Sequence, residues 1–262
     1  MPRPRNRFFA ILTICAAMVV AGCATADLTP TQLAVSAAEQ PLVAKGRDLF
    51  NDVKLSGDGK WSCASCHPNN AHTNNLTYVG VNVVPDGDPN GRSTPTMWGV
   101  GQRAALSWAG TAPSLSANIR AIIVNRMKGP EPSPETLAAL VAYLKSLGYP
   151  VNPNLKADGT PTDAASAAAK RGFAVFDRAG CKACHLPPTY DKKDLEDVFS
   201  GGTFKVPSLR VVSLTAPYFH DGRYKTLDEA VKFMWEYVQK AGTSEKLTDA
   251  DLRDLVEFLK IL

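Results

Sequence analysis

The chain has 262 residues, of which 45% are hydrophobic, and a formal net charge of +4. This length allows two small domains, each with its own core, and the apolar fraction is ordinary for a globular protein. No patch of basic residues indicates a nucleic-acid partner.

The first 22 residues resemble a bacterial secretory signal of the lipoprotein type. Three arginines precede an apolar run over residues 8–21, which is too short to span a membrane. The run ends in Val20-Ala-Gly-Cys23, which resembles a lipobox and implies that Cys23 is lipidated and becomes the mature N-terminus. An ordinary signal peptide cleaved nearby is the alternative. If this segment is removed, its three arginines are lost and 26 of the 29 basic residues remain, against 25 acidic residues. The mature chain is then expected to be almost neutral. We expect a protein in the periplasm, anchored by lipid to a bacterial membrane. The outer membrane is favoured because Ala24 follows the cysteine.

The remaining chain divides by composition into four parts. Residues 23–40 are small and polar and predict a tether with one short helix after Pro30. A first domain is expected over residues 41–148 and a second over 164–262. The linker between them, residues 149–163, is rich in Pro, Asn, Gly and Asp.

Both expected domains contain the pattern C-x-x-C-H, as Cys63-Ala-Ser-Cys66-His67 and Cys181-Lys-Ala-Cys184-His185. This is the attachment signature of a c-type haem. The two thiols can form thioethers to the two vinyl groups of one porphyrin, and the histidine that follows can bind the iron. A zinc site of four cysteines, or a pair of disulfides, would leave both histidines unexplained. A thioredoxin-like pair requires a βαβ setting that the sequence does not show. We therefore predict two covalently bound haems.

Several further segments are repeated in the two halves. Gly46-x-x-x-Phe50 and Gly172-x-x-x-Phe176 precede the two motifs, as on the first helix of cytochrome c domains, where the glycine lets two helices cross closely. Residues 140–147 match residues 255–262, and both stretches have a helical apolar pattern. Residues 95–115 align with residues 207–227, which pairs Trp108 with His220 and Gly110 with Gly222. Strand signals are scarce, and the valine-rich residues 79–84 are interpreted as a loop. The predicted fold is all-α, with two tandem cytochrome c domains that each hold one haem.

Residues 205–223, followed by 226–234, resemble the electron-transfer domain of bacterial di-haem cytochrome c peroxidases. The same superfamily contains the MauG-like maturation enzymes, and the resemblance covers most of residues 40–262. It implies that His185 and Met234 are the axial ligands of the second haem iron. MauG-like enzymes carry tyrosine at the position of Met234, so this residue favours the peroxidase-like or electron-transfer branch. His220 is expected to be structural and not a ligand.

For the first haem, His67 is the proximal ligand and the sixth site has several candidates. Met127 lies where the family places distal-pocket residues and is favoured. His72 follows His67 by only five residues, which makes the far face of the ring hard to reach. Met97 aligns with Leu209, which indicates a core position. An open site is the fourth alternative.

The resemblance also marks residues that differ from the family pattern. Arg126 stands where a peroxidase is expected to carry its catalytic glutamate, and Glu131 could substitute only if its loop folds back. Trp108 matches the tryptophan between the haems, so it is a candidate electron relay, with interdomain packing as the alternative. The family's interdomain calcium would use an Asn side chain and two carbonyls.

In this calcium site the two carbonyls would come from Thr215 and Pro217. The position of the Asn side chain is occupied by Ser93, so calcium is not favoured.

The sequence favours a carrier of single electrons, with a small redox protein (a cytochrome c or a cupredoxin) as donor or acceptor. If the protein is an enzyme, it is expected to be a cytochrome c peroxidase that reduces hydrogen peroxide at the first haem with electrons from the second. MauG-like oxidation of a partner protein is a weaker alternative. Nothing in the sequence indicates an oligomeric state.

Overall fold

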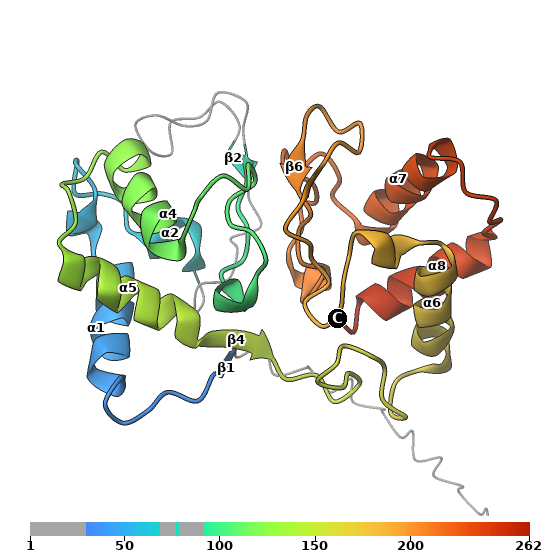
Figure 1. The fold of residues 1–262 in the computed structure, drawn as a ribbon, viewed down its shortest axis with the longest axis horizontal. Helices are drawn as coiled ribbons and strands as arrows, with labels where there is room; N and C mark the ends of the chain where they lie inside the picture. The colour runs from blue at the N-terminus through green and yellow to red at the C-terminus, as the bar shows by residue number, and fades with distance from the viewer. Residues whose placement is uncertain (1–29, 69–76, 79–91) are drawn as a thin grey trace, which may run out of the picture.

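The computed structural model describes residues 30–68, 77–78 and 92–262 (Figure 1). The expected signal segment, the lipidation site Cys23, the candidate ligand His72 and the valine-rich residues 79–84 lie outside the described residues. The described helices form two groups, one from each half of the chain (Figure 1). None of these helices is both long enough and apolar enough to cross a membrane.

The first half contains the α-helices α1 (Gln40–Phe50), α2 (Cys63–Cys66), α4 (Leu115–Ala121) and α5 (Pro134–Ser146). Short 3-10 helices cover η1 (Val53–Leu55) and η2 (Val100–Gln102), and a π-helix, η3 (Ile122–Arg126), continues α4. Helix α5 begins at Pro134 because the Ser133 hydroxyl accepts a hydrogen bond from the Thr136 amide and proline suits the first helical turn.

The second half contains α6 (Ala167–Arg178), α7 (Leu227–Lys240) and α8 (Asp249–Leu259), with 3-10 helices η4 (Cys181–Ala183) and η5 (Val212–Leu214). Helices α7 and α8 both begin with a capping box, formed by Thr226 with Glu229 and by Thr248 with Asp251. In each box the threonine and the acidic side chain satisfy amides that the first turn would otherwise leave unpaired.

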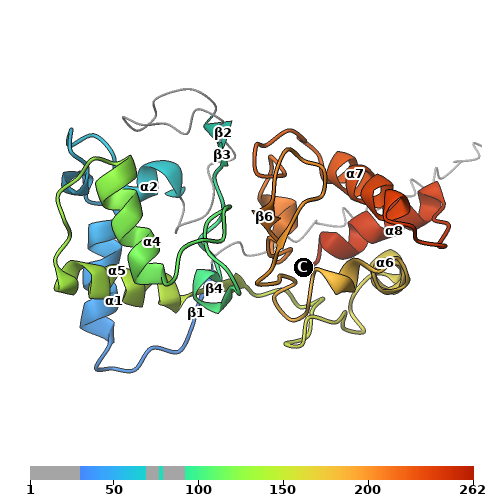
Figure 2. The ribbon, with the colours of Figure 1, turned by 45° about the horizontal axis from the view of Figure 1, so that its top comes forward.

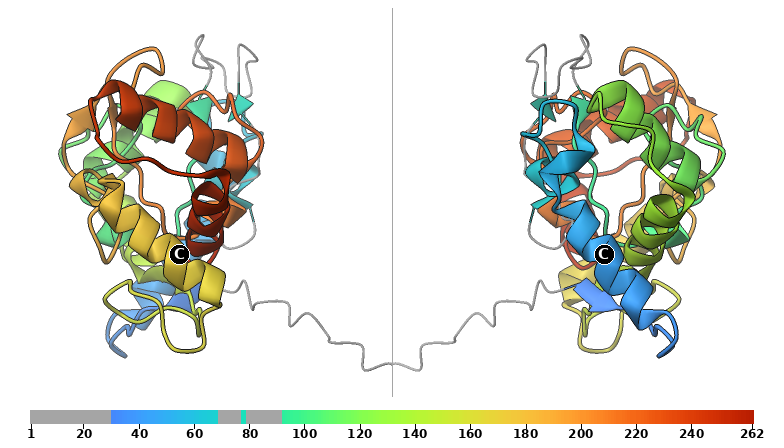
Figure 3. Two further views of the ribbon diagram at one scale, coloured as in Figure 1. Left: turned by 90° about the vertical axis from the view of Figure 1, so that its right-hand side faces the viewer. Right: turned by 90° about the vertical axis from the view of Figure 1, so that its left-hand side faces the viewer.

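Each half is built on a close crossing of two helices at a glycine, as the sequence predicts. A Cβ atom on Gly46 of α1 would overlap the carbonyl oxygen of Ala139 in α5, and one on Gly172 of α6 would overlap that of Asp254 in α8. Figure 3 shows the α6–α8 pair from one end of the molecule and the α1–α5 pair from the other. Only glycine lets the two backbones approach this closely.

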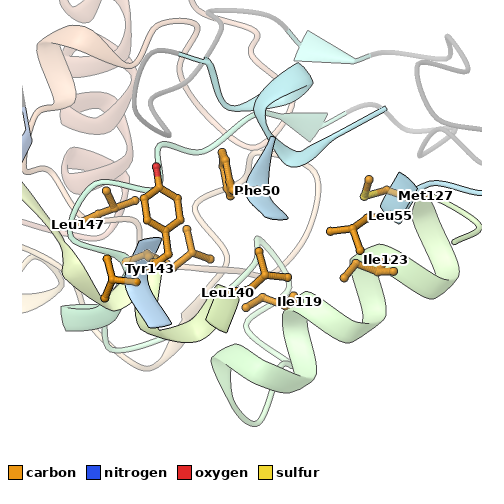
Figure 4. Packing of buried hydrophobic residues seen from close by; sticks show 11 residues of the cluster. Phe50, Leu55, Ile119, Ile123, Met127, Leu140, Tyr143 and Leu147 are labelled. Atoms are coloured by element: carbon orange, nitrogen blue, oxygen red, sulfur yellow. The ribbon is translucent and has the colours of Figure 1, made fainter. Parts of the chain in front are cut away.

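Each half also has its own hydrophobic core. Figure 4 shows the first, with Leu147 and Tyr143 at one end and Met127 beside Leu55 at the other. The largest buried side chains of the second core are Phe176, Tyr190 and Phe258, whose rings pack edge to face.

The all-α prediction is too narrow, because the structure has three antiparallel strand pairs. They are β1 (Pro30–Gln32) with β4 (Leu147–Pro150), β2 (Thr77–Tyr78) with β3 (Arg92–Ser93), and β5 (Leu195–Glu196) with β6 (Phe204–Lys205). The short helix expected after Pro30 is wrong, since residues 30–32 form β1. Helix α5 ends at Ser146, and the backbone that follows needs new hydrogen-bond partners, which β1 supplies.

The repeat seen in the sequence is also a repeat in structure. In the alignment of residues 95–115 with 207–227, η2 coincides with η5, and Gly110 and Gly222 have φ angles of 65° and 66°. Extended by two residues, the alignment pairs Ser93 with Lys205 and β3 with β6. These loops face each other between the two halves (Figure 2).

The backbone hydrogen bonds across the interface follow the repeat. The Ser93 amide donates to the His220 carbonyl at 2.7 Å, and the equivalent Lys205 amide donates to the Trp108 carbonyl at 3.0 Å. This reciprocal exchange is what a two-fold arrangement of similar units produces. The interface therefore places residues of each half directly against the other half.

Candidate functional site

The first half encloses a cavity of about 380 Å³ that contains the first sequence motif in its wall. Cys63, Cys66 and His67 line it from α2 and the residue that follows. Arg126 and Met127 line it from the end of η3. The structure thus brings together the two thiols, the imidazole and the favoured methionine that the sequence singled out.

The second half has a corresponding cavity of about 220 Å³. Cys181, Cys184 and His185 line it from η4 and the chain after it, and Met234 lines it from α7. Met234 is the only methionine among the described residues that line this cavity.

All four cysteines of the motifs are free thiols. Burial raises the pKa of Cys63 to about 12 and that of Cys181 to about 11, so both thiols are protonated at neutral pH. A redox-active C-x-x-C pair has a lowered thiol pKa instead. The described residues also form no cluster of three or more His, Cys, Asp and Glu side chains that could hold a metal ion. Two free thiols, an imidazole and a thioether on the walls of one mainly apolar cavity fit a c-type haem.

The backbone fixes the tautomer of the His185 ring. Its Nδ1 lies 3.0 Å from the Tyr190 carbonyl oxygen, and because a carbonyl only accepts, Nδ1 carries the proton. Burial lowers the pKa of His185, which keeps the ring neutral at pH 7. The Nε2 lone pair is therefore the one available to a metal, and a backbone partner of this kind fixes the ligand's tautomer.

Two of the methionines proposed for the first site line its cavity. Met127 is 3% exposed, and its amide donates to the Ile122 carbonyl at 2.9 Å, which closes the π-helical turn. Met97 is half-buried and also lines the cavity. A π-helical turn adds a residue to the helix and is common at functional sites. It changes the angle at which the next side chain, Met127, leaves the helix.

Glu131 does not reach the first cavity. Its carboxylate pairs with Arg120, with Nη2 and Oε2 2.7 Å apart, and both side chains are about half exposed. The loop therefore does not fold back to supply a carboxylate. No described residue that lines the first cavity carries a carboxyl group.

Trp108 and Lys205 line both cavities. The Trp108 indole donates to the Ser93 carbonyl at 2.8 Å, and the Lys205 ammonium lies 5.9 Å from the centre of the indole ring. The His220 ring is 6.4 Å from that of Trp108 and stacks on Phe204 at 3.7 Å. His220 Nε2 lies 2.9 Å from the Ser200 carbonyl oxygen, which agrees with the structural role expected for it.

Ser93 occupies the joint where the resemblance implies calcium. Its hydroxyl donates a hydrogen bond to the Pro217 carbonyl at 3.0 Å. One of the two carbonyls that would bind the ion is therefore engaged by the residue that replaces the asparagine. The residues present do not fit this calcium site.

Several polar residues in the wall of the first cavity were missed by the sequence analysis, and they include Arg92, Arg103, Asn118 and Lys205. Lys205 begins the motif that resembles the peroxidases, but its repeat equivalent is an uncharged serine. Arg103 lies in the repeated segment opposite Thr215 and is likewise without a charged counterpart. The sequence signal that could have identified Arg103 and Lys205 is a charged residue within a mainly apolar segment.

Comparison with known proteins agrees with both halves of this description. Residues 40–154 match the family described as di-haem cytochrome c peroxidase, and residues 169–262 match the cytochrome c family. The methylamine utilization protein MauG of Methylorubrum extorquens is 28% identical over 277 residues, which cover 84% of this chain and 77% of that protein. The cytochrome c551 peroxidase of Pseudomonas aeruginosa is 27% identical over 272 residues, covering 83% and 77% of the two chains.

The fold agrees as well. A chain of hydrazine synthase from Kuenenia stuttgartiensis, solved under 20 bar of xenon, has a TM-score of 0.68 and 22% identity, with 99% of this chain and 100% of that chain covered. The two domains are of the cytochrome c type, which implies haem cofactors. Residues 40–154 therefore belong to the di-haem cytochrome c peroxidase family and residues 169–262 to the cytochrome c family, and the chain has relatives named MauG and cytochrome c peroxidase.

Proposed function

We propose that this protein is a di-haem c-type cytochrome that carries single electrons between redox partners. Cys63 and Cys66 would bind one haem covalently and Cys181 and Cys184 the other. Each haem supplies a one-electron iron couple whose potential depends on its axial ligands. The two separate cavities, each with its own pair of thiols and its own histidine, support this assignment.

The axial ligands proposed are His67 and Met127 in the first cavity, and His185 and Met234 in the second. A methionine ligand raises the potential of a haem, which suits a carrier. Trp108 is proposed as the relay between the haems, because its indole forms part of both cavity walls.

The observation that carries this proposal is the composition of the first cavity. Peroxide reduction requires an open iron and a group that moves a proton between the two oxygens. The described wall contains Met127 and Met97 but no carboxyl group, and Arg126 cannot accept a proton because its guanidinium stays charged. These residues favour a closed first site.

Peroxide reduction at the first haem is the second candidate, with electrons supplied by the second haem. The match of residues 40–154 to the peroxidase family favours it. Arg126 could then stabilise negative charge in the distal pocket. A MauG-like oxidation of a partner protein is less well supported, since Met234 replaces the tyrosine of those enzymes.

The sequence supports a place and a partner for this activity. We propose that Cys23 anchors the protein by lipid to a bacterial membrane, facing the periplasm, with the outer membrane favoured. The partner would be a small redox protein, a cytochrome c or a cupredoxin. The single electrons that such proteins exchange match the one-electron chemistry of the two haem sites.

The proposal is tested by the number and spin state of the haems. A pyridine haemochrome assay should return two haems per chain, and one would contradict the assignment of the cofactors. Magnetic circular dichroism should show the first haem low-spin in both the oxidised and the half-reduced protein. Met127→Ala should make it high-spin, whereas Met97→Ala, in the same cavity wall, should leave it low-spin. A high-spin first haem in the half-reduced wild-type protein would instead favour the peroxidase.

A further inference from the structure

Four cationic side chains line the described wall of the first cavity, namely Arg92, Arg103, Arg126 and Lys205. Arg126 is proposed for the distal pocket, and the Arg92 Cζ lies 5.4 Å from the centre of the Phe204 ring. Neither Arg103 nor Lys205 has a role in the ligand assignment. Lys205 is 6% exposed, and Arg103 lies in the same wall. The Arg103 Nη2 donates to the Trp98 carbonyl at 2.8 Å, but its buried Nε has no hydrogen-bond partner among the described residues. A buried charge destabilises a protein unless an opposite charge or a set of hydrogen bonds compensates it.

The described surroundings compensate these charges poorly. Burial and the nearby Arg103 lower the pKa of Lys205 to about 7. Asp191 is the acidic group that opposes this shift, but its carboxylate accepts hydrogen bonds from the Ala104 amide at 3.0 Å and the Thr189 hydroxyl at 2.6 Å. Among the described residues no ion pair joins Asp191 to either cation.

A haem in this cavity would bring negative charge to these two cations. A haem is apolar over most of its surface but carries two propionate carboxylates. A guanidinium binds a carboxylate through two parallel hydrogen bonds, and an ammonium binds it as a point charge. The rest of this wall is mainly apolar side chains and the haem-binding motif, with Arg92 and Arg126 as its other cations. Arg103 and Lys205 are therefore suited to bind carboxylates in this cavity.

We propose that Arg103 and Lys205 bind the propionate groups of the first haem. This inference rests on the proposed function, because it requires a haem in the first cavity. Lys205 also lines the second cavity, whereas Arg103 does not. The charge of Lys205 therefore acts on both haems. Arg103 and Lys205 together act more strongly on the first haem than on the second.

Positive charge near a haem favours the reduced iron, so its loss should lower the reduction potential. In Lys205→Gln, the ratio of reduced to oxidised first haem at a fixed potential should fall about tenfold, a shift of about 59 mV for one electron. Arg103→Gln should lower this ratio by a similar factor. Lys205→Arg keeps a positive charge and should leave the ratio at the wild-type value. Lys193→Gln, which removes an exposed charge, is the control and should change neither haem.

Spectroelectrochemical titration measures both potentials, and resonance Raman spectra report the propionate bending modes of the same samples. The proposal predicts that these modes shift in Lys205→Gln and Arg103→Gln. It is overturned if both variants match the Lys193→Gln control. It is also overturned if the potentials fall while the propionate modes stay unchanged, since the cations would then serve a carboxylate of the protein. Arg103→Gln keeps the test decisive if Lys205→Gln does not fold. A haem count below two per chain, with the first haem missing, would refute the di-haem assignment and this proposal with it. Two haems per chain with unchanged propionate modes would refute this proposal alone.

Discussion

At the scale of single residues, the two sites are built differently. In the second, the half-buried His185 is neutral and oriented by the Tyr190 carbonyl, and Met234 shares its cavity. The first site has two methionines in its wall and the longer list of cations. The two haems are therefore expected to differ in potential even though both attachment motifs are the same.

Met234→Ala should remove one axial ligand from the second haem. No other methionine lines that cavity among the described residues, so no second thioether is available to replace it. Near-infrared magnetic circular dichroism should show one sulfur-to-iron band fewer than in the wild type. Val238→Ala, which alters the same wall without removing a ligand, should keep every band. A Met234→Ala spectrum with no ligand lost would show that Met234 is not the ligand.

The residues of the two sites differ in how far sequence could predict them. The thiols and histidines follow from C-x-x-C-H, because adjacency in the chain places them together. Met127 and Met234 required resemblance to a family, since the chain gives no spacing rule for a ligand that arrives from another helix. Lys205 could not be found that way, because only the packing of the second half against the first brings it to the first cavity. Arg103 follows η2, and the sequence does not predict that its side chain lines the cavity. The pairing of Glu131 with Arg120 depends on the path of a loop.

At the scale of elements, the helices followed from local signals that the structure confirms. Ser133-Pro134 and Thr248-x-x-Asp251 begin helices α5 and α8, and the two glycines mark the crossings. The strands could not be predicted, because each has two to four residues and shows no alternating pattern. Strand β1 pairs with β4, more than a hundred residues away, and such pairing leaves no local trace.

Gly172→Ala should destabilise the second domain. The new Cβ would overlap the Asp254 carbonyl oxygen and lie 2.8 Å from the Phe258 Cβ, so α6 and α8 must separate. Overpacking of this kind typically costs about 1–3 kcal/mol of unfolding free energy. Urea titration of the haem-loaded protein, followed by circular dichroism, measures the change. Lys170→Ala, on the exposed side of α6, should change it by less than about 0.5 kcal/mol. Equal stability of the two variants would rule out a backbone contact at Gly172.

At the scale of the whole molecule, two similar halves meet through equivalent hydrogen bonds but supply different side chains. Ser93 corresponds to Lys205, and Trp108 corresponds to His220. The repeat was visible in the sequence, but its use as an interface was not, because the alignment says only which residues are equivalent. The differences at equivalent positions give the first cavity more positive charge than the second.

The proposed membrane attachment is a property of the whole molecule and would depend on Cys23. Cys23→Ala should move the protein from the membrane to the soluble fraction of cells. Two or more acyl chains hold a protein firmly, since each buried methylene contributes about 0.8 kcal/mol. Cys15→Ala, within the apolar run of the signal, is the matched control and should leave the fractionation unchanged. Retention of Cys23→Ala in the membrane fraction would show that the anchor lies elsewhere.

The central claim is that the first site is closed and serves electron transfer. Steady-state reduction of hydrogen peroxide by the half-reduced protein, with a reduced cytochrome c as donor, tests it most directly. Without a proton-transferring side chain, a factor of about 10²–10⁴ in rate is lost, so turnover should be far below the ordinary enzymatic range of about 1–10³ s⁻¹. Met127→Ala should raise it only to a weak activity. Turnover within the enzymatic range, together with a high-spin first haem, would contradict the account and identify the protein as a peroxidase.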